Sequence, residues 1–151
     1  MLNCATTKDR CGQYIGIDDN KVELLKQVVD QTNAKIVLVS TWKEFWYRDL
    51  CLKDEQDNMA TYLDKKLAKQ GLRIIDKTND YNSTNRGKAI NNYLWKIKSM
   101  GVEVDNYIIL DDELFDYMSA KLTKCLVRTN FDSGLTETHV RKAVAKLCSV
   151  Q

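Results

Sequence analysis

The chain has 151 residues, of which 44% are hydrophobic and 29% charged, and this composition is typical of one globular domain over residues 1–151. Its net charge of +2 is too small to indicate nucleic-acid binding by itself. No apolar run approaches the about 18 residues of a membrane span, and the N-terminus lacks the basic and apolar regions of a signal peptide. The five cysteines are scattered without a CxxC pair and accompany a single histidine, which argues against zinc and suits a cytoplasmic protein with reduced thiols.

The first clear helical pattern follows the acidic pair Asp18-Asp19, which suits a helix N-cap, and Asn33 is a plausible end. Residues 1–17 before it show no clear period. Residues 36–39 are four consecutive apolar residues, three of them β-branched. They predict a strand buried on both faces, as in parallel sheets covered by helices.

The remaining pattern alternates strands with amphipathic helices. Helices are expected at 55–70, at 86–100, near 114–118 and after Thr136, and strands near 72–75, 107–110 and 125–127. This alternation predicts an α/β fold with a doubly wound parallel sheet and helices on both faces. Ligands of such sheets bind beyond the carboxyl ends of the strands.

Carboxylates gather where the expected strand 107–110 ends. Asp111 and Asp112 follow it directly, with Glu113 and Asp116 close behind. Hard oxygen ligands at a strand end suit Mg²⁺, which binds one or two carboxylates together with water and substrate phosphate. The alternative is a solvated acidic start of a helix, and the residues alone leave both open.

Hydroxyls and cations occupy two other junctions between elements. Ser40 and Thr41 end the strand 36–39, where a hydroxyl can hold a phosphate oxygen or simply cap the next helix. Arg86 and Lys88 open a helix after a polar loop, where a cation can neutralise phosphate or form an exposed basic turn. Taken alone, each of these two motifs favours the structural alternative.

Taken together, the order of hydroxyl, cation and acid pair resembles the haloacid dehalogenase (HAD) superfamily and is most similar to the HAD domain of Swiss Army Knife RNA-repair proteins. The resemblance implies that Ser40, or Thr41 beside it, binds phosphate, and that Arg86, or Lys88 as second choice, is the cation. It also implies that Asp111 and Asp112 lie at Mg²⁺, with Asp116 as a further acid. The matching segments include 16–18, 21–25, 34–42, 86–87, 107–112 and 134–136.

The first motif of that family, a strand ending in Asp-x-Asp-Gly, is absent from the sequence. In the family its first Asp attacks phosphorus and forms an aspartyl-phosphate. The resemblance therefore implies a domain N-terminally truncated relative to the family, without its first central strand. We expect a phosphatase-type hydrolase scaffold that is catalytically incomplete as residues 1–151.

Three functions remain open at this point. The first is a Mg²⁺-dependent phosphohydrolase acting on a phosphorylated small molecule, such as a nucleotide, or on a nucleic-acid end, with no membrane partner. The second is a non-catalytic domain that binds phosphate or metal. The third is a flavodoxin-like or receiver-like regulatory domain, but receivers carry their acid pair after the first strand, whereas this pair comes late.

Overall fold

The computed structural model describes residues 1–43, 46, 59–79, 85–114 and 119–149. The expected acid Asp116 lies outside these residues, and so does the expected helix near 114–118 apart from its first residue. In chain order the elements are β1 (Arg10–Cys11), β2 (Tyr14–Ile15), α1 (Asp19–Thr32), β3 (Ile36–Leu38), the 3-10 turn η1 (Thr41–Lys43), α2 (Met59–Ala68), β4 (Ile74–Lys77), α3 (Arg86–Ser99), β5 (Ile109–Asp111), α4 (Ala120–Cys125), β6 (Leu126–Arg128) and α5 (Glu137–Cys148).

The longer strands pair in parallel, as the sequence predicts. β3 pairs with β4 and β5 with β6, both in parallel, whereas β1 and β2 form an antiparallel hairpin. Among the described residues these are three two-stranded sheets and not one continuous sheet. The chain is therefore a mixed α/β domain with parallel strand pairs.

Local sequence signals explain the ends of the first and last helices. The Asp18 carboxylate accepts the backbone N–H of Asn20 at the start of α1, and Asn33 ends that helix in the left-handed region with a φ of 53°. At the start of α5, Thr136 and His139 form a capping box through their side chains. The helix limits expected at Asp18, Asn33 and Thr136 are confirmed.

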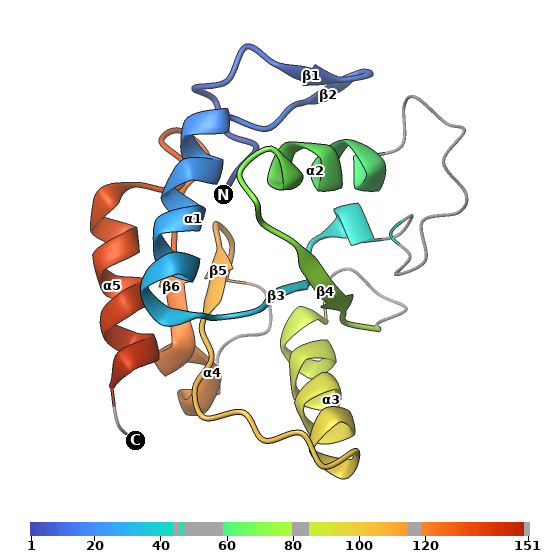
Figure 1. Ribbon diagram of the computed structural model, residues 1–151, viewed down its shortest axis with the longest axis vertical. Helices are drawn as coiled ribbons and strands as arrows, with labels where there is room; N and C mark the ends of the chain where they lie inside the picture. The colour runs from blue at the N-terminus through green and yellow to red at the C-terminus, as the bar shows by residue number, and fades with distance from the viewer. Residues whose placement is uncertain (44–45, 47–58, 80–84, 115–118, 150–151) are drawn as a thin grey trace.

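Helices α1 and α5 pack side by side on one flank, and α3 lies on the other side of the strands (Figure 1). The largest buried cluster, which includes Ile17, Val22, Leu67 and Leu135, joins α1 and α2. A second cluster joins α1, β6 and α5, and a third packs α3 against β5. The strands are thus held between two helical flanks.

Strand β3 is less buried than its sequence predicts. Residues 36–39 are all half-buried, although the apolar run predicts burial on both faces. Within the described residues β3 pairs with β4 alone, so its second edge has no strand beside it. Solvent reaches apolar side chains along such an edge, which accounts for the difference.

In the part of the chain that the structure describes, no helix is both long enough and apolar enough to cross a membrane.

Candidate functional site

The carboxyl end of β5 places Asp111 at the centre of a buried polar network. Its side chain is 4% exposed, and its Oδ1 accepts the backbone N–H of Asp112 at 2.9 Å and that of Glu113 at 3.4 Å. Its backbone carbonyl accepts the N–H of Thr129, which follows β6. The turn after β5 is therefore fixed by the Asp111 carboxylate and by the neighbouring strand.

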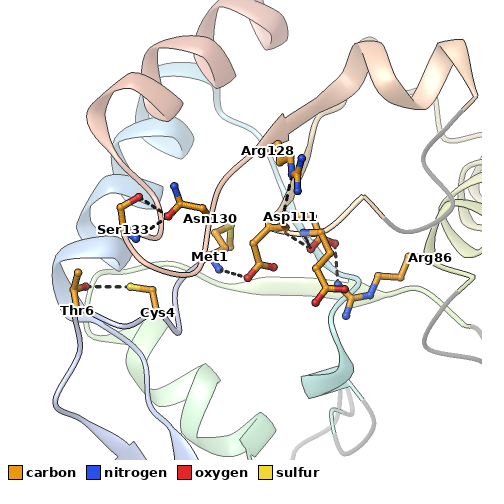
Figure 2. A network of polar contacts seen from close by, with 10 residues as sticks. Met1, Cys4, Thr6, Arg86, Asp111, Arg128, Asn130 and Ser133 are labelled. Atoms are coloured by element: carbon orange, nitrogen blue, oxygen red, sulfur yellow. Dashed lines mark hydrogen bonds and ion pairs between the residues drawn. The ribbon is translucent and has the colours of Figure 1, made fainter.

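Arg86 reaches this carboxylate from the first residue of α3. Its Nη1 lies 2.8 Å from Asp111 Oδ2, and its side chain is 12% exposed (Figure 2). The next residue, Gly87, is buried, and Ile90 one turn later packs with Ile109. The apolar face of α3 thus holds the guanidinium against the end of β5. The two residues that the sequence predicts as cation and acid are in direct contact.

Asp112 is the more accessible member of the acid pair. Its side chain is 31% exposed, and its Oδ2 lies 3.9 Å from the α-amino group of Met1. Arg128 Nε approaches its backbone carbonyl at 3.4 Å (Figure 2). The Met1 carbonyl in turn accepts the N–H of Leu135, so the first residues are anchored beside the loop after β6. Positive groups therefore surround the end of β5.

Ser40 lies where β3 leads into η1. Its Oγ accepts the backbone N–H of Trp42 at 3.2 Å, which leaves the hydroxyl proton able to point toward an acceptor. The preceding Val39 packs against the cluster that contains Ile109, so the ends of β3 and β5 belong to one region of the core. Among the described residues, the hydrogen bonds of Ser40 go to the backbone N–H groups of Trp42 and Lys43 and not to Arg86 or Asp111.

Two lysines fix η1 to the end of β4. Lys43 is buried and its Nζ donates to Thr78 Oγ1 at 3.1 Å, whereas Lys77 Nζ donates to the Lys43 carbonyl at 2.9 Å. Thr78 also donates its N–H to the Leu38 carbonyl at the end of β3. Sequence reasoning missed Lys43, because a lone lysine in an aromatic stretch predicts an exposed side chain.

Two of the other predicted residues lie at the surface. Thr41 and Lys88 are exposed, and Asp116 lies outside the described residues. Arg128, which contacts the turn after β5, was not predicted, because a single arginine at the end of a short strand carries no motif.

A second charged network ties the β1–β2 hairpin to α1 and α2. Lys66 Nζ lies 2.5 Å from Asp9 Oδ2 and 2.8 Å from Asp19 Oδ1, and the Tyr62 hydroxyl donates to Asp9. Hydrogen bonds from Lys66 and then Tyr62 lower the pKa of Asp9 from 3.8 to about 2. Burial alone would lower the pKa of Lys66, but its bonds to Asp19 and Asp9 outweigh burial and raise it.

The acid pair offers a small set of metal ligands. Within the described residues, no group of three His, Cys, Asp or Glu side chains is arranged to hold a metal ion. Both oxygens of Asp111 already have protein partners, so Asp112 is the accessible carboxylate. One carboxylate together with phosphate and water is within the range of Mg²⁺ sites. The arrangement fits a metal that arrives with a phosphate better than a metal held by protein alone.

Comparison with known proteins supports the resemblance seen in the sequence. No curated protein and no solved structure matches the chain. A family model described as the HAD domain in Swiss Army Knife RNA repair proteins matches residues 2–140, and this match covers nearly the whole chain. The α/β fold with its parallel strand pairs agrees with this match. The chain therefore belongs to the family of HAD domains found in Swiss Army Knife RNA repair proteins.

Proposed function

We propose that the domain is a Mg²⁺-dependent phosphohydrolase scaffold that binds a phosphomonoester beside Arg86 but does not hydrolyse it as residues 1–151. The observation that carries this proposal is the buried contact of Arg86 with Asp111 at the end of β5, which joins two of the predicted motifs. The family membership supports a HAD-like hydrolase domain, and a nucleotide or an RNA end is the proposed phosphate-bearing substrate.

The chain's own residues have distinct roles in this proposal. Asp111 holds Arg86 and shapes the turn, so that the guanidinium can neutralise a phosphoryl oxygen. The Ser40 hydroxyl, whose oxygen accepts from Trp42, donates its proton to another oxygen of the same group. Asp112 is the carboxylate that would hold Mg²⁺. When bound, that ion neutralises phosphate charge and polarises the phosphoryl group.

A nucleophile is the missing part. The sequence contains no Asp-x-Asp-Gly, and of the acid pair Asp111 is buried and paired with Arg86. Cations and a metal can neutralise the phosphoryl group, but they do not supply the attacking carboxylate. We therefore expect binding without turnover.

The strand edges offer a place for a further strand. Within the described residues β3 and β5 each pair on one edge only, and apolar residues 36–39 are half-buried. These observations favour a further parallel strand between β3 and β5, ending near the acid pair. A carboxylate at the end of that strand would complete the site.

Phosphate binding tests the proposal without requiring turnover. Arg86→Gln and Ser40→Ala should each weaken binding of inorganic phosphate, measured by ³¹P NMR titration, by about tenfold or more, because each removes a hydrogen bond to a charged group. Arg73→Gln, which changes an exposed arginine before β4, is the matched control and should have no effect. Equal phosphate affinity in all four proteins would contradict the proposed site.

The second candidate function is a non-catalytic phosphate-binding domain. The pairing of Asp111 with Arg86 favours it, because an engaged carboxylate is a poor metal ligand. This reading predicts phosphate binding that does not depend on Mg²⁺ and that stays uncoupled from hydrolysis in every longer form of the chain.

A further inference from the structure

Helix α3 carries an unusual local charge. Its 14 residues include Arg86, Lys88, Lys96 and Lys98 and no acidic residue, whereas the whole chain has nearly equal numbers of acids and bases. No described ion pair involves Lys96 or Lys98. Arg86 is paired with Asp111, but the positive charge of Lys96 and Lys98 at the far end of the helix can attract polyanions.

The outward face of the same helix exposes a large aromatic side chain. The inward face buries Gly87, Ala89 and Ile90, and Ile90 packs against β5. Trp95, by contrast, is 74% exposed, which is the highest value among the large hydrophobic side chains described. Core packing therefore does not account for a tryptophan at this position.

Helical geometry arranges polar and basic residues around Trp95. Positions 88, 92, 95 and 99 recur at spacings of four, three and four, so they form one stripe along the exposed face. Lys96 and Lys98 lie on either side of Trp95, because successive residues are about 100° apart around the helix. The amides of Asn91 and Asn92 are exposed on the turn before it.

This combination matches the chemistry of single-stranded nucleic acid. A tryptophan face stacks any base, lysines contact the backbone phosphates, and asparagine amides both donate to and accept from base edges. A protein partner would instead favour an apolar surface with few charges at its centre. Lysines on both sides of the aromatic ring favour a polyanion.

The stripe is separate from the proposed phosphate site. Trp95 follows Arg86 by nine residues, which is about 14 Å along the helix axis and about 180° around it. Arg86 therefore lies on the inward face of α3 in contact with Asp111, whereas Trp95 lies on the exposed face. A strand stacked on Trp95 does not need to occupy the site at Arg86.

We propose that the exposed face of α3, formed by Trp95, Lys96 and Lys98 with Asn91 and Asn92, binds single-stranded nucleic acid. The proposal goes beyond the proposed function, because it assigns a second binding surface that is separate from the site at Arg86. Binding to α3 itself depends on the helix surface and not on catalysis.

The test measures fluorescence anisotropy of a labelled oligouridine of about 12 nucleotides, within the site sizes of single-strand binders, titrated with the full chain. Trp95→Ala should weaken binding by about tenfold or more, and Trp95→Phe should recover most of it because the ring still stacks. Phe131→Ala, which removes another exposed aromatic side chain, is the control and should bind like the parent.

Charge reversal tests the flanking lysines. Lys96→Glu/Lys98→Glu should weaken oligouridine binding at low salt. It should also reduce the slope of log affinity against log salt concentration by about two. Lys121→Glu/Lys142→Glu changes two exposed lysines on α4 and α5 by the same charge and should have a smaller effect. Equal losses in the two double variants would show general attraction to a basic protein and would overturn the assignment to α3.

Two measurements separate this inference from the proposed phosphate site. Trp95→Ala should leave inorganic phosphate binding unchanged, and added inorganic phosphate should leave binding of an oligouridine with a 3′-hydroxyl end unchanged at constant ionic strength. If Trp95→Ala binds oligouridine as tightly as the parent, the inference is overturned, and the proposed phosphate site is unaffected. Concentration-dependent self-association that Trp95→Ala abolishes, without any oligouridine binding, would also overturn it and assign the face to a second copy of the chain.

Discussion

Arg86 Nη1 lies 2.8 Å from Asp111 Oδ2, and this ion pair joins the start of α3 to the end of β5 across 25 positions of the sequence. Both side chains are largely buried, at 12% and 4% exposed. The pair therefore holds the proposed phosphate-binding cation in place and is itself part of the fold.

Breaking this pair from one side should destabilise the protein strongly. Arg86→Leu leaves the buried Asp111 carboxylate without its guanidinium partner, and we expect a loss of about 3–5 kcal/mol in the free energy of unfolding. The measurement is urea unfolding followed by circular dichroism. Arg73→Leu, at an exposed arginine, should change stability by less than about 0.5 kcal/mol.

The double variant Arg86→Leu/Asp111→Asn should recover part of that loss. It removes the unpaired buried charge, and the asparagine oxygen can still accept the backbone N–H of Asp112. If the double variant loses as much stability as the sum of the two single variants, the two side chains are not coupled as described.

Acid should weaken the network that joins the β1–β2 hairpin to α2. The pKa of Asp9 is lowered to about 2 by Lys66 and Tyr62, below its ordinary value of 3.8. A depressed pKa contributes stability that is present above about pH 4 and is lost as the pH falls toward 2. Because Asp9 is 42% exposed, we expect a contribution of about 1 kcal/mol or less.

Asp9→Asn should therefore lower stability at about pH 6 but have a smaller effect at about pH 3, where the parent carboxylate begins to lose its charge. The readout is the urea midpoint at the two pH values. Asp132→Asn, at an exposed carboxylate, is the control. An effect of Asp9→Asn that is equal at both pH values would contradict the assigned role of Lys66.

Magnesium binding should depend on phosphate. Asp112 is the accessible carboxylate of the acid pair, and a single carboxylate holds Mg²⁺ weakly unless phosphate completes the ligand set. We expect isothermal titration calorimetry to detect Mg²⁺ more strongly in the presence of inorganic phosphate, and Asp112→Asn to abolish this difference. Asp105→Asn, at an exposed carboxylate, should preserve it. Tight Mg²⁺ binding without phosphate would point to ligands other than Asp112.

Sequence reasoning predicted the elements whose signals are local. The limits of α1 follow from Asp18 and Asn33, which cap the helix through their own side chain and backbone. The strand ending at Asp111 and the helix starting at Arg86 were also expected within one or two residues. These signals lie within a few positions of the feature that they predict, so tertiary contacts do not override them.

Other features depend on distant partners or are too short to show a period. The β1–β2 hairpin has two residues in each strand, and α4 has six residues, so neither carries a readable pattern. Burial of Lys43 depends on Thr78, which lies 35 positions later. The sequence identified Arg86 and Asp111 as candidates for phosphate and metal, but it could not indicate that they bind each other.

The central claim is that residues 1–151 carry the phosphate site of a HAD-like hydrolase without its nucleophile. The most direct measurement compares hydrolysis of p-nitrophenyl phosphate and 3′-phosphorylated RNA by residues 1–151 and by a form extended at the N-terminus with an apolar strand that ends in Asp-x-Asp-Gly. We expect turnover by residues 1–151 to be several orders of magnitude lower, because loss of a nucleophile has that effect. The extended form should be active with Mg²⁺, and its Asp112→Asn variant should be inactive. Robust Mg²⁺-dependent turnover by residues 1–151, abolished by Arg86→Gln, would contradict the claim and place the nucleophile within this chain.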